Sequence, residues 1–247
     1  MNTAERSWRV LFFPHYVFES VPVEAVQQNL RRIFTDWGLP RFLRVDNGQP
    51  WGSRSDLPSQ LTLWLLGLGV EVMHNRPYHP TENARVERSH STMKAWVEPQ
   101  RCANLAALQQ RLEEAARLQR EVYPAIGGCS RSQAYTQLAT NPRRYQPQQE
   151  SQQWRIERVL AYLRCQRWVR KVDAGGRISL FNRNYFVTRR QAGQRVYVRV
   201  DPEQAAWVVE NPQGQVLARP ACPQLCARSI CQLEVLYREP SRPRRGA

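Results

Sequence analysis

Two short stretches of sequence, about thirty residues apart, determine the predicted fold. The first is Asp46-Asn47-Gly48, which follows the apolar run Phe42-Leu43-Arg44-Val45. The second reads Pro77-Tyr78-His79-Pro80-Thr81-Glu82-Asn83-Ala84-Arg85-Val86-Glu87-Arg88. A carboxylate at the exposed end of a strand and a second one at the start of a helix can together hold hard divalent cations, which prefer oxygen ligands. Asp46 and Glu87 are therefore the candidate catalytic and metal-ligating residues.

Neither stretch is specific by itself, because Asp-Asn-Gly is typical of turns and Val-Glu-Arg of a solvated helix face. Their order is more informative. Trp37-Gly-Leu-Pro40 precedes a strand, Asp-Asn-Gly follows it, an apolar helix ends at Leu66-Gly-Leu-Gly69, and a second strand leads to the Pro-Tyr-His-Pro loop. This order resembles the second and third acidic positions of integrase-type (DDE) transposases, most closely the insertion-sequence transposases of the IS481 type, over nearly the whole chain.

The resemblance implies an α/β RNase H-like core and a small all-β barrel after it. It also implies Mg²⁺ (or Mn²⁺) as cofactor, and DNA strand cleavage and strand transfer by phosphoryl transfer. The implied partners are the terminal repeats of the element and target DNA, bound by a homo-oligomer.

The chain departs from this family at the first catalytic aspartate, which in relatives lies on a central strand well before the Asp-Asn-Gly. Only 45 residues precede Asp46, and none of the first 35 is an aspartate. Asp36 is the earliest, but the pattern puts it at the end of a helix. We expect a chain truncated at its N-terminus or a decayed element. The alternatives are a non-catalytic DNA-binding remnant that inhibits the full-length enzyme, and a basic structural DNA-binding protein unrelated to recombination.

Composition favours a polyanionic partner. The 247-residue chain carries a formal net charge of +15, and 36 of its residues are lysine or arginine, all arginine except Lys94 and Lys171. Guanidinium groups suit phosphate oxygens, although an arginine-biased genome would also favour arginine over lysine.

No apolar run approaches the roughly 20 residues that span a bilayer, and the N-terminus lacks the basic and then apolar pattern of a signal peptide. We therefore expect no membrane partner and a cytoplasmic protein.

The helix predicted from about residue 83 to 97 places Glu87, His90, Ser91 and Lys94 on one face. The resemblance assigns DNA contacts to basic residues near this glutamate, and the candidates are Arg76, Arg85, Arg88 and Lys94. A solvated basic helix edge is the alternative for Arg85, Arg88 and Lys94.

Three other residues could be mistaken for members of the site. His79 could transfer a proton, although loop histidines are more often structural. Glu82 lies in the turn before the helix, and Glu87 is preferred because its Val-Glu-Arg context matches the family. Asp56 could replace a missing ligand, but its loop setting favours an ordinary turn residue.

Residues 1–145 are predicted to form the truncated core, which contains further elements besides the two strands and the helix at 83–97 named above. Residues 8–20 are predicted to form a strand, 23–34 a helix, 61–68 a buried helix, and 103–122 an amphipathic helix whose apolar stripe favours core packing over partner binding. A polar linker and short helix over 146–165 follow.

Beyond the linker the pattern alternates, and five short strands between 176 and 217 predict a small barrel over 166–220. Val196, Val198 and Val200 would face inward, while Arg195, Tyr197 and Arg199 face outward. Arg195 and Arg199 are therefore candidate DNA-binding residues, with a purely structural barrel as the alternative.

The C-terminal tail, residues 221–247, is expected to be basic and disordered. Cys222, Cys226 and Cys231 within it lack the fourth ligand of a structural zinc site.

Overall fold

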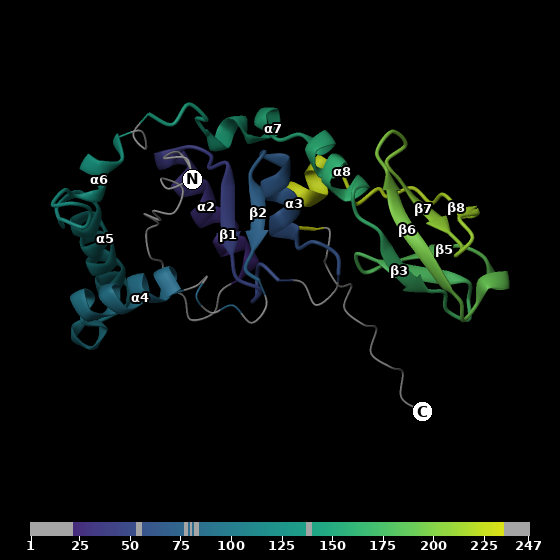
Figure 1. Ribbon diagram of the computed structural model, residues 1–247, viewed down its shortest axis with the longest axis horizontal. Coiled ribbons are helices and arrows are strands. Elements are labelled where there is room, and N and C mark those ends of the chain that lie inside the picture. The colour runs from purple at the N-terminus through teal and green to yellow at the C-terminus, as the bar shows by residue number, and fades with distance from the viewer. Residues whose placement is uncertain are drawn as a thin grey trace. The chain divides into compact units, whose positions relative to one another are not determined.

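The computed structural model describes residues 22–52, 56–76, 79, 81, 84–136 and 140–234, and Figure 1 shows their arrangement. The strand expected over residues 8–20 and the residues Pro77, Tyr78 and Glu82 lie outside this part. The fold is mixed α/β with several separate sheets. The chain forms two compact units, residues 1–40 with 74–147 and residues 41–73 with 148–247. The domain boundaries given above stay predictions.

The described residues of the first unit form helices. These are α2 (Val23–Trp37), α4 (Ala84–Val97), α5 (Leu105–Glu121) and α6 (Arg131–Ala134), with the 3-10 turn η2 (Pro99–Arg101) after α4. Met93 and Val97 of α4 pack against Leu112 and Ala115 of α5, so the amphipathic pattern of α5 corresponds to core packing, as predicted.

Helix α2 is held by the segment that follows α6 in the chain. The ring of Phe34 meets the ring of Tyr145 edge-on at 5.8 Å between centroids. The Asn141 side-chain amide donates to the Trp37 carbonyl at 2.8 Å, and the Arg143 guanidinium donates to the Pro40 carbonyl at 2.7 Å. The first bond satisfies a carbonyl group that the end of the helix leaves without a partner, and the second holds the segment that follows the helix.

The second unit begins with a strand–helix–strand segment. Strand β1 (Phe42–Val45) pairs with β2 (Glu71–His74), and α3 (Gln60–Gly67) connects them. The Glu71 N–H donates to the Arg41 carbonyl, so the two strands begin side by side and run parallel. Every residue of α3 after Gln60 is buried, which explains why its sequence is almost continuously apolar.

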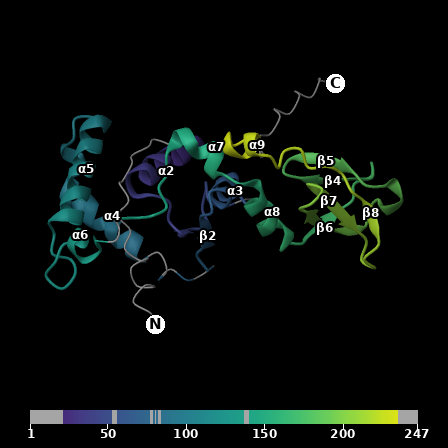
Figure 2. The same cartoon turned by 90° about the horizontal axis from the view of Figure 1, so that it is seen from above.

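The rest of this unit contains α7 (Glu150–Gln153) after the turn η4 (Pro147–Gln149), α8 (Ile156–Arg164) and six strands. Strands β3 (Trp168–Lys171), β6 (Arg195–Asp201), β7 (Ala206–Glu210) and β8 (Val216–Ala218) form an antiparallel sheet in the order β3-β6-β7-β8. Strands β4 (Arg177–Leu180) and β5 (Arg183–Phe186) form a hairpin beside it (Figure 2).

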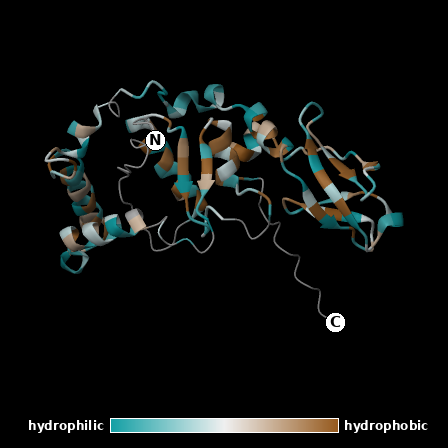
Figure 3. Ribbon diagram, in the orientation of Figure 1, coloured by the Kyte–Doolittle hydropathy of each residue, from teal (hydrophilic) through white to brown (hydrophobic). Residues whose placement is uncertain are grey.

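The five strands predicted between residues 176 and 217 are confirmed, and so is the alternation along β6, which is visible as alternating colours in Figure 3. The predicted closed barrel is not shown, because the described strands form a four-stranded sheet and a separate hairpin. Their common core surrounds the fully buried Trp207, whose ring lies 5.8 Å from that of Trp168 and 6.0 Å from that of Phe181.

The segment after β8 differs from the disordered tail that was expected. Cys222, Leu225, Ile230 and Leu233 are buried, and residues 227–231 form the short helix α9 (Ala227–Cys231). Gln224 donates a hydrogen bond to the Tyr185 hydroxyl, and burial raises the pKa of that hydroxyl. The apolar residues between 222 and 233 are therefore numerous enough to form a packed segment. Residues 235–247 lie outside the described part.

None of the helices in the described residues has the length and apolar character that a membrane crossing requires.

A tight contact joins α3 to the segment around α7. The Trp154 indole N–H donates to the Trp64 carbonyl at 3.1 Å, the Trp64 indole N–H donates to the Glu150 carboxylate at 3.3 Å, and the Arg155 N–H donates to the Gly67 carbonyl at 2.9 Å. The Trp154 ring lies so close to Gly67 that a Cβ there would overlap it.

We therefore expect Gly67→Ala to destabilise the protein by about 1–3 kcal/mol, the usual cost of forcing extra volume into a packed core. Thermal unfolding followed by circular dichroism measures the effect. Gly175→Ala is the matched control, because its Cβ would meet only the side chain of Asp173, at 3.2 Å. Equal unfolding midpoints for the two variants would contradict the packing described here.

Candidate functional site

Asp46 lies where the sequence placed it, directly after β1. Leu43 and Val45 of this strand are buried, and Asp46 is exposed at its end. One carboxylate oxygen of Asp46 accepts the Gly48 N–H at 3.1 Å, a turn in which the side chain caps its own backbone. The carboxylate is thereby held beside the end of the strand, and its other oxygen accepts no hydrogen bond from the residues that the structure describes.

Glu87 lies in the first turn of α4 and is exposed. Met93 and Val97 define the buried side of this helix, whereas Glu87, His90, Ser91 and Lys94 are all exposed, as expected for one shared face. Arg88 is exposed as well, and the side chain of Arg85 falls outside the described part.

Asp46 and Glu87 belong to different units, so their convergence on a shared metal stays a prediction. Within the residues that the structure describes, no group of three or more His, Cys, Asp or Glu side chains could hold a metal ion. Arg76 and His79 are exposed and joined by a bond from the His79 N–H to the Arg76 carbonyl. The roles assigned to these residues also stay predictions.

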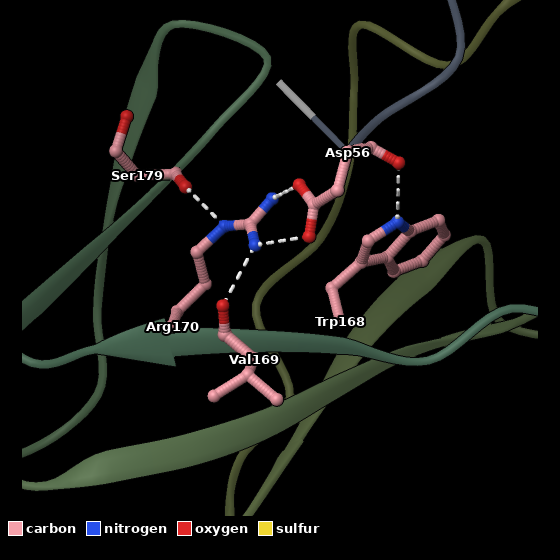
Figure 4. Close-up of polar contacts among 5 residues, drawn as sticks. All are labelled: Asp56, Trp168, Val169, Arg170 and Ser179. Atoms are coloured by element: carbon pink, nitrogen blue, oxygen red, sulfur yellow. Dashed lines mark hydrogen bonds and ion pairs between the residues drawn. The ribbon is translucent and has the colours of Figure 1, made fainter. Parts of the chain in front are cut away.

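Asp56, considered above as a substitute ligand, has a different role in the structure. Its two carboxylate oxygens accept hydrogen bonds from the Arg170 guanidinium at 2.7 and 3.0 Å, and its backbone carbonyl accepts one from the Trp168 indole N–H at 3.2 Å (Figure 4). Arg170 also donates to the Ser179 carbonyl at 3.2 Å. Strand β3 therefore anchors the chain ten residues after Asp46.

This ion pair could not be recognised from the sequence, because 114 residues separate its two members and no local motif marks either of them. The hydrogen bonds from Arg170 lower the pKa of Asp56 below its ordinary value, against the opposing effect of partial burial. Asp56 is thus held ionised as an anchor.

The outward face of β6 carries the predicted residues Arg195, Tyr197 and Arg199, but they differ in what they contact. Arg199 is paired with the Glu210 carboxylate at 3.0 Å. The Arg167 guanidinium lies over the Tyr197 ring, 4.0 Å from its centroid, and 3.8 Å from Glu210. Arg195 is exposed and has no ion pair among the described residues. Glu210 therefore neutralises part of this surface, whereas Arg195, opposite the exposed Lys171 of β3, pairs with no carboxylate in the described residues.

Residues 162–216 match the family model of the Mu transposase C-terminal domain. The match covers α8 from its last turn, β3 to β7 and the start of β8, less than a quarter of the chain. It supports a transposase family and, through it, a role in DNA recombination. The anchor residues Trp168 and Arg170, and the cluster around Glu210, all fall within the matched segment.

The Asp56–Arg170 pair should contribute to stability only where Asp56 is ionised. Because the pKa of Asp56 is lower in the folded chain than its ordinary value near 4, the contribution is complete above that value and disappears as the pH falls through the folded pKa. More than half of the Asp56 side chain is exposed, so Asp56→Asn should cost about 0.5–1 kcal/mol at pH 7. The difference from wild type should shrink as the pH falls below about 4, the ordinary pKa of an aspartate.

Denaturant unfolding at a series of pH values measures this difference. Glu203→Gln is the control, because Glu203 is exposed and its carboxylate has no bond among the described residues. A difference for Asp56→Asn that is constant from neutral pH to acid would contradict the assignment of the pair.

Proposed function

We propose that this chain is a transposase-type DNA recombination protein, with an RNase H-like core of the IS481 type followed by a small barrel. The observation that carries the proposal is the match of residues 162–216 to the Mu transposase C-terminal domain. The net charge of +15 and the arginine-rich surface suit a phosphate backbone as the partner. The parallel strand–helix–strand segment that presents Asp46 is consistent with such a core.

Asp46 and Glu87 would ligate Mg²⁺ or Mn²⁺. Both carboxylates are exposed, and no cationic side chain in the described residues forms an ion pair with either, so their oxygens suit a hard cation. Divalent ions bound there would activate the attacking oxygen and stabilise the leaving one in an in-line displacement at phosphorus.

The remaining groups would bind and orient DNA. Arg76, Arg85, Arg88 and Lys94 would contact the phosphates beside the carboxylates, and Arg195 those along β6. Strand cleavage by water and attack of the new 3′-hydroxyl on target DNA are both displacements at phosphorus, so one site would serve both reactions. A homo-oligomer would hold the two DNA ends.

A second candidate function is a DNA-binding remnant without catalytic activity. The observation that favours it is the position of Asp36, which lies in the last turn of α2 and not on a strand, so that it does not supply a third carboxylate. With two carboxylates in place of three, the metal site would be weaker.

A strand-joining assay separates the two functions. We expect the chain to join an oligonucleotide with a free 3′-hydroxyl to supercoiled plasmid in the presence of Mg²⁺ or Mn²⁺, and we expect Asp46→Asn and Glu87→Gln to abolish joining. Glu113→Gln, an exposed change on α5, is the control. If all four proteins bind DNA and none joins it, the result would contradict the first function and support the second. If the wild-type protein fails to bind DNA, both functions would be ruled out.

Arg195 and Arg199 should differ in their contribution to DNA binding. Each phosphate contact that is lost reduces the slope of log affinity against log salt by about 1. We expect Arg195→Ala to show this reduction and Arg199→Ala a smaller one, because Glu210 already neutralises Arg199. Fluorescence anisotropy with a labelled duplex over a series of salt concentrations measures the slopes. Equal reductions for the two variants would show that Glu210 releases Arg199 when DNA binds.

A further inference from the structure

Phe186, at the end of β5, is unusually exposed for its size. Its side chain is 59% exposed, more than any other large apolar side chain described in the second unit. The hairpin does have a buried face, which takes Ile178, Leu180 and Tyr185. The exposure of Phe186 is therefore not explained by the absence of a hydrophobic core beneath the hairpin.

Two arginines lie near Phe186, together with the Asp173 carboxylate, which accepts the backbone N–H of Arg177 at 2.8 Å. Arg177 lies directly opposite it in the β4–β5 register, and Ser179 pairs with Asn184 on the same face. Arg189 follows three residues after Phe186, in the turn η5 (Arg189–Gln191). Both arginines are exposed, and in the part of the chain that the structure describes neither guanidinium has an ion pair.

Gly176 brings these groups together. Its carbonyl accepts the N–H groups of Val187 and Thr188 at 2.8 and 3.2 Å, which fixes the chain after β5 against the start of β4. Its φ is +79°, and a Cβ there would lie 2.7 Å from the Arg189 nitrogen. This close approach, which only glycine allows, sets the backbone of Arg189 beside the Arg177–Phe186 pair.

The combination fits one kind of partner. Guanidinium groups attract phosphates, and an exposed aromatic ring stacks on the face of a base. In an intact duplex the base faces are covered by neighbouring base pairs, so the ring gains a partner only where nucleotides are unpaired. Tyr197 is not such a ring, because the Arg167 guanidinium covers it.

We propose that the β4–β5 hairpin binds single-stranded DNA, with Phe186 stacking on an unpaired base while Arg177 and Arg189 bind the flanking phosphates. This inference rests on the proposed DNA recombination function and adds to it a preference for unpaired strands. The preference resides in the hairpin, whereas β6 contributes only charge.

The test compares the full chain on two labelled DNAs, a blunt duplex and the same duplex with a 3′ single-stranded extension. Wild type should bind the extended DNA more tightly, by about fivefold or more, the lower range for stacking of one base on an aromatic ring. Phe186→Leu keeps an apolar side chain but removes the ring, so it should lose this preference and bind the blunt duplex as wild type does. A 2-aminopurine in the extension should be quenched by wild type and not by the variant.

Tyr162→Leu is the matched control, because Tyr162 is an exposed aromatic residue on α8 that belongs to neither proposed contact. Blunt-duplex binding without preference for the extension, unchanged in Phe186→Leu, would overturn this inference and leave the proposed function standing. An equal loss on both DNAs would overturn it as well, since it would indicate an apolar contact that does not depend on unpaired bases. Failure of wild type to bind either DNA would overturn both.

Discussion

The reciprocal indole hydrogen bonds between Trp64 and the segment around Trp154 are the contact on which the second unit depends. Each of the two buried indoles supplies a donor whose partner lies on the other segment, and Gly67 leaves room for the Trp154 ring. A buried polar group without a partner is costly, so the two segments are more stable together than apart. This contact joins residues 41–73 and 148–234 in one unit, although 74 residues, 74–147, separate them in the chain.

The Asp56–Arg170 pair forms a second attachment between the same two segments. It differs from the indole contact because it is partly exposed and ionic, and it therefore contributes less to stability. Its importance lies in its position. Arg170 belongs to the segment that matches the transposase domain, and Asp56 belongs to the loop region that follows Asp46. Through this pair the matched domain holds the chain ten residues after the candidate metal ligand.

Local patterns in the sequence were sufficient to predict most elements but few of the contacts between them. The alternation of Val196, Val198 and Val200 indicates which face of β6 is buried, and the density of apolar residues over 61–68 indicates a buried helix. Both patterns can be read from the sequence because each arises within one element. The burial of Glu150 has no such signal, since it depends on an indole 86 residues away. The proposed pairing of Asp46 with Glu87 came from family resemblance, and each is exposed on its own unit.

Charge is the property that sequence composition described least well. A count of arginines treats Arg195 and Arg199 alike, but the two differ in their contacts, because Arg199 forms an ion pair with Glu210. The same carboxylate lies near Arg167, whose guanidinium covers the one aromatic ring of that face. Much of the outward face of β6 is therefore satisfied internally. The exposed ring of Phe186 and the arginines beside it lack such partners in the described structure, so the hairpin, and not the longest strand, has the groups most available to a nucleic acid.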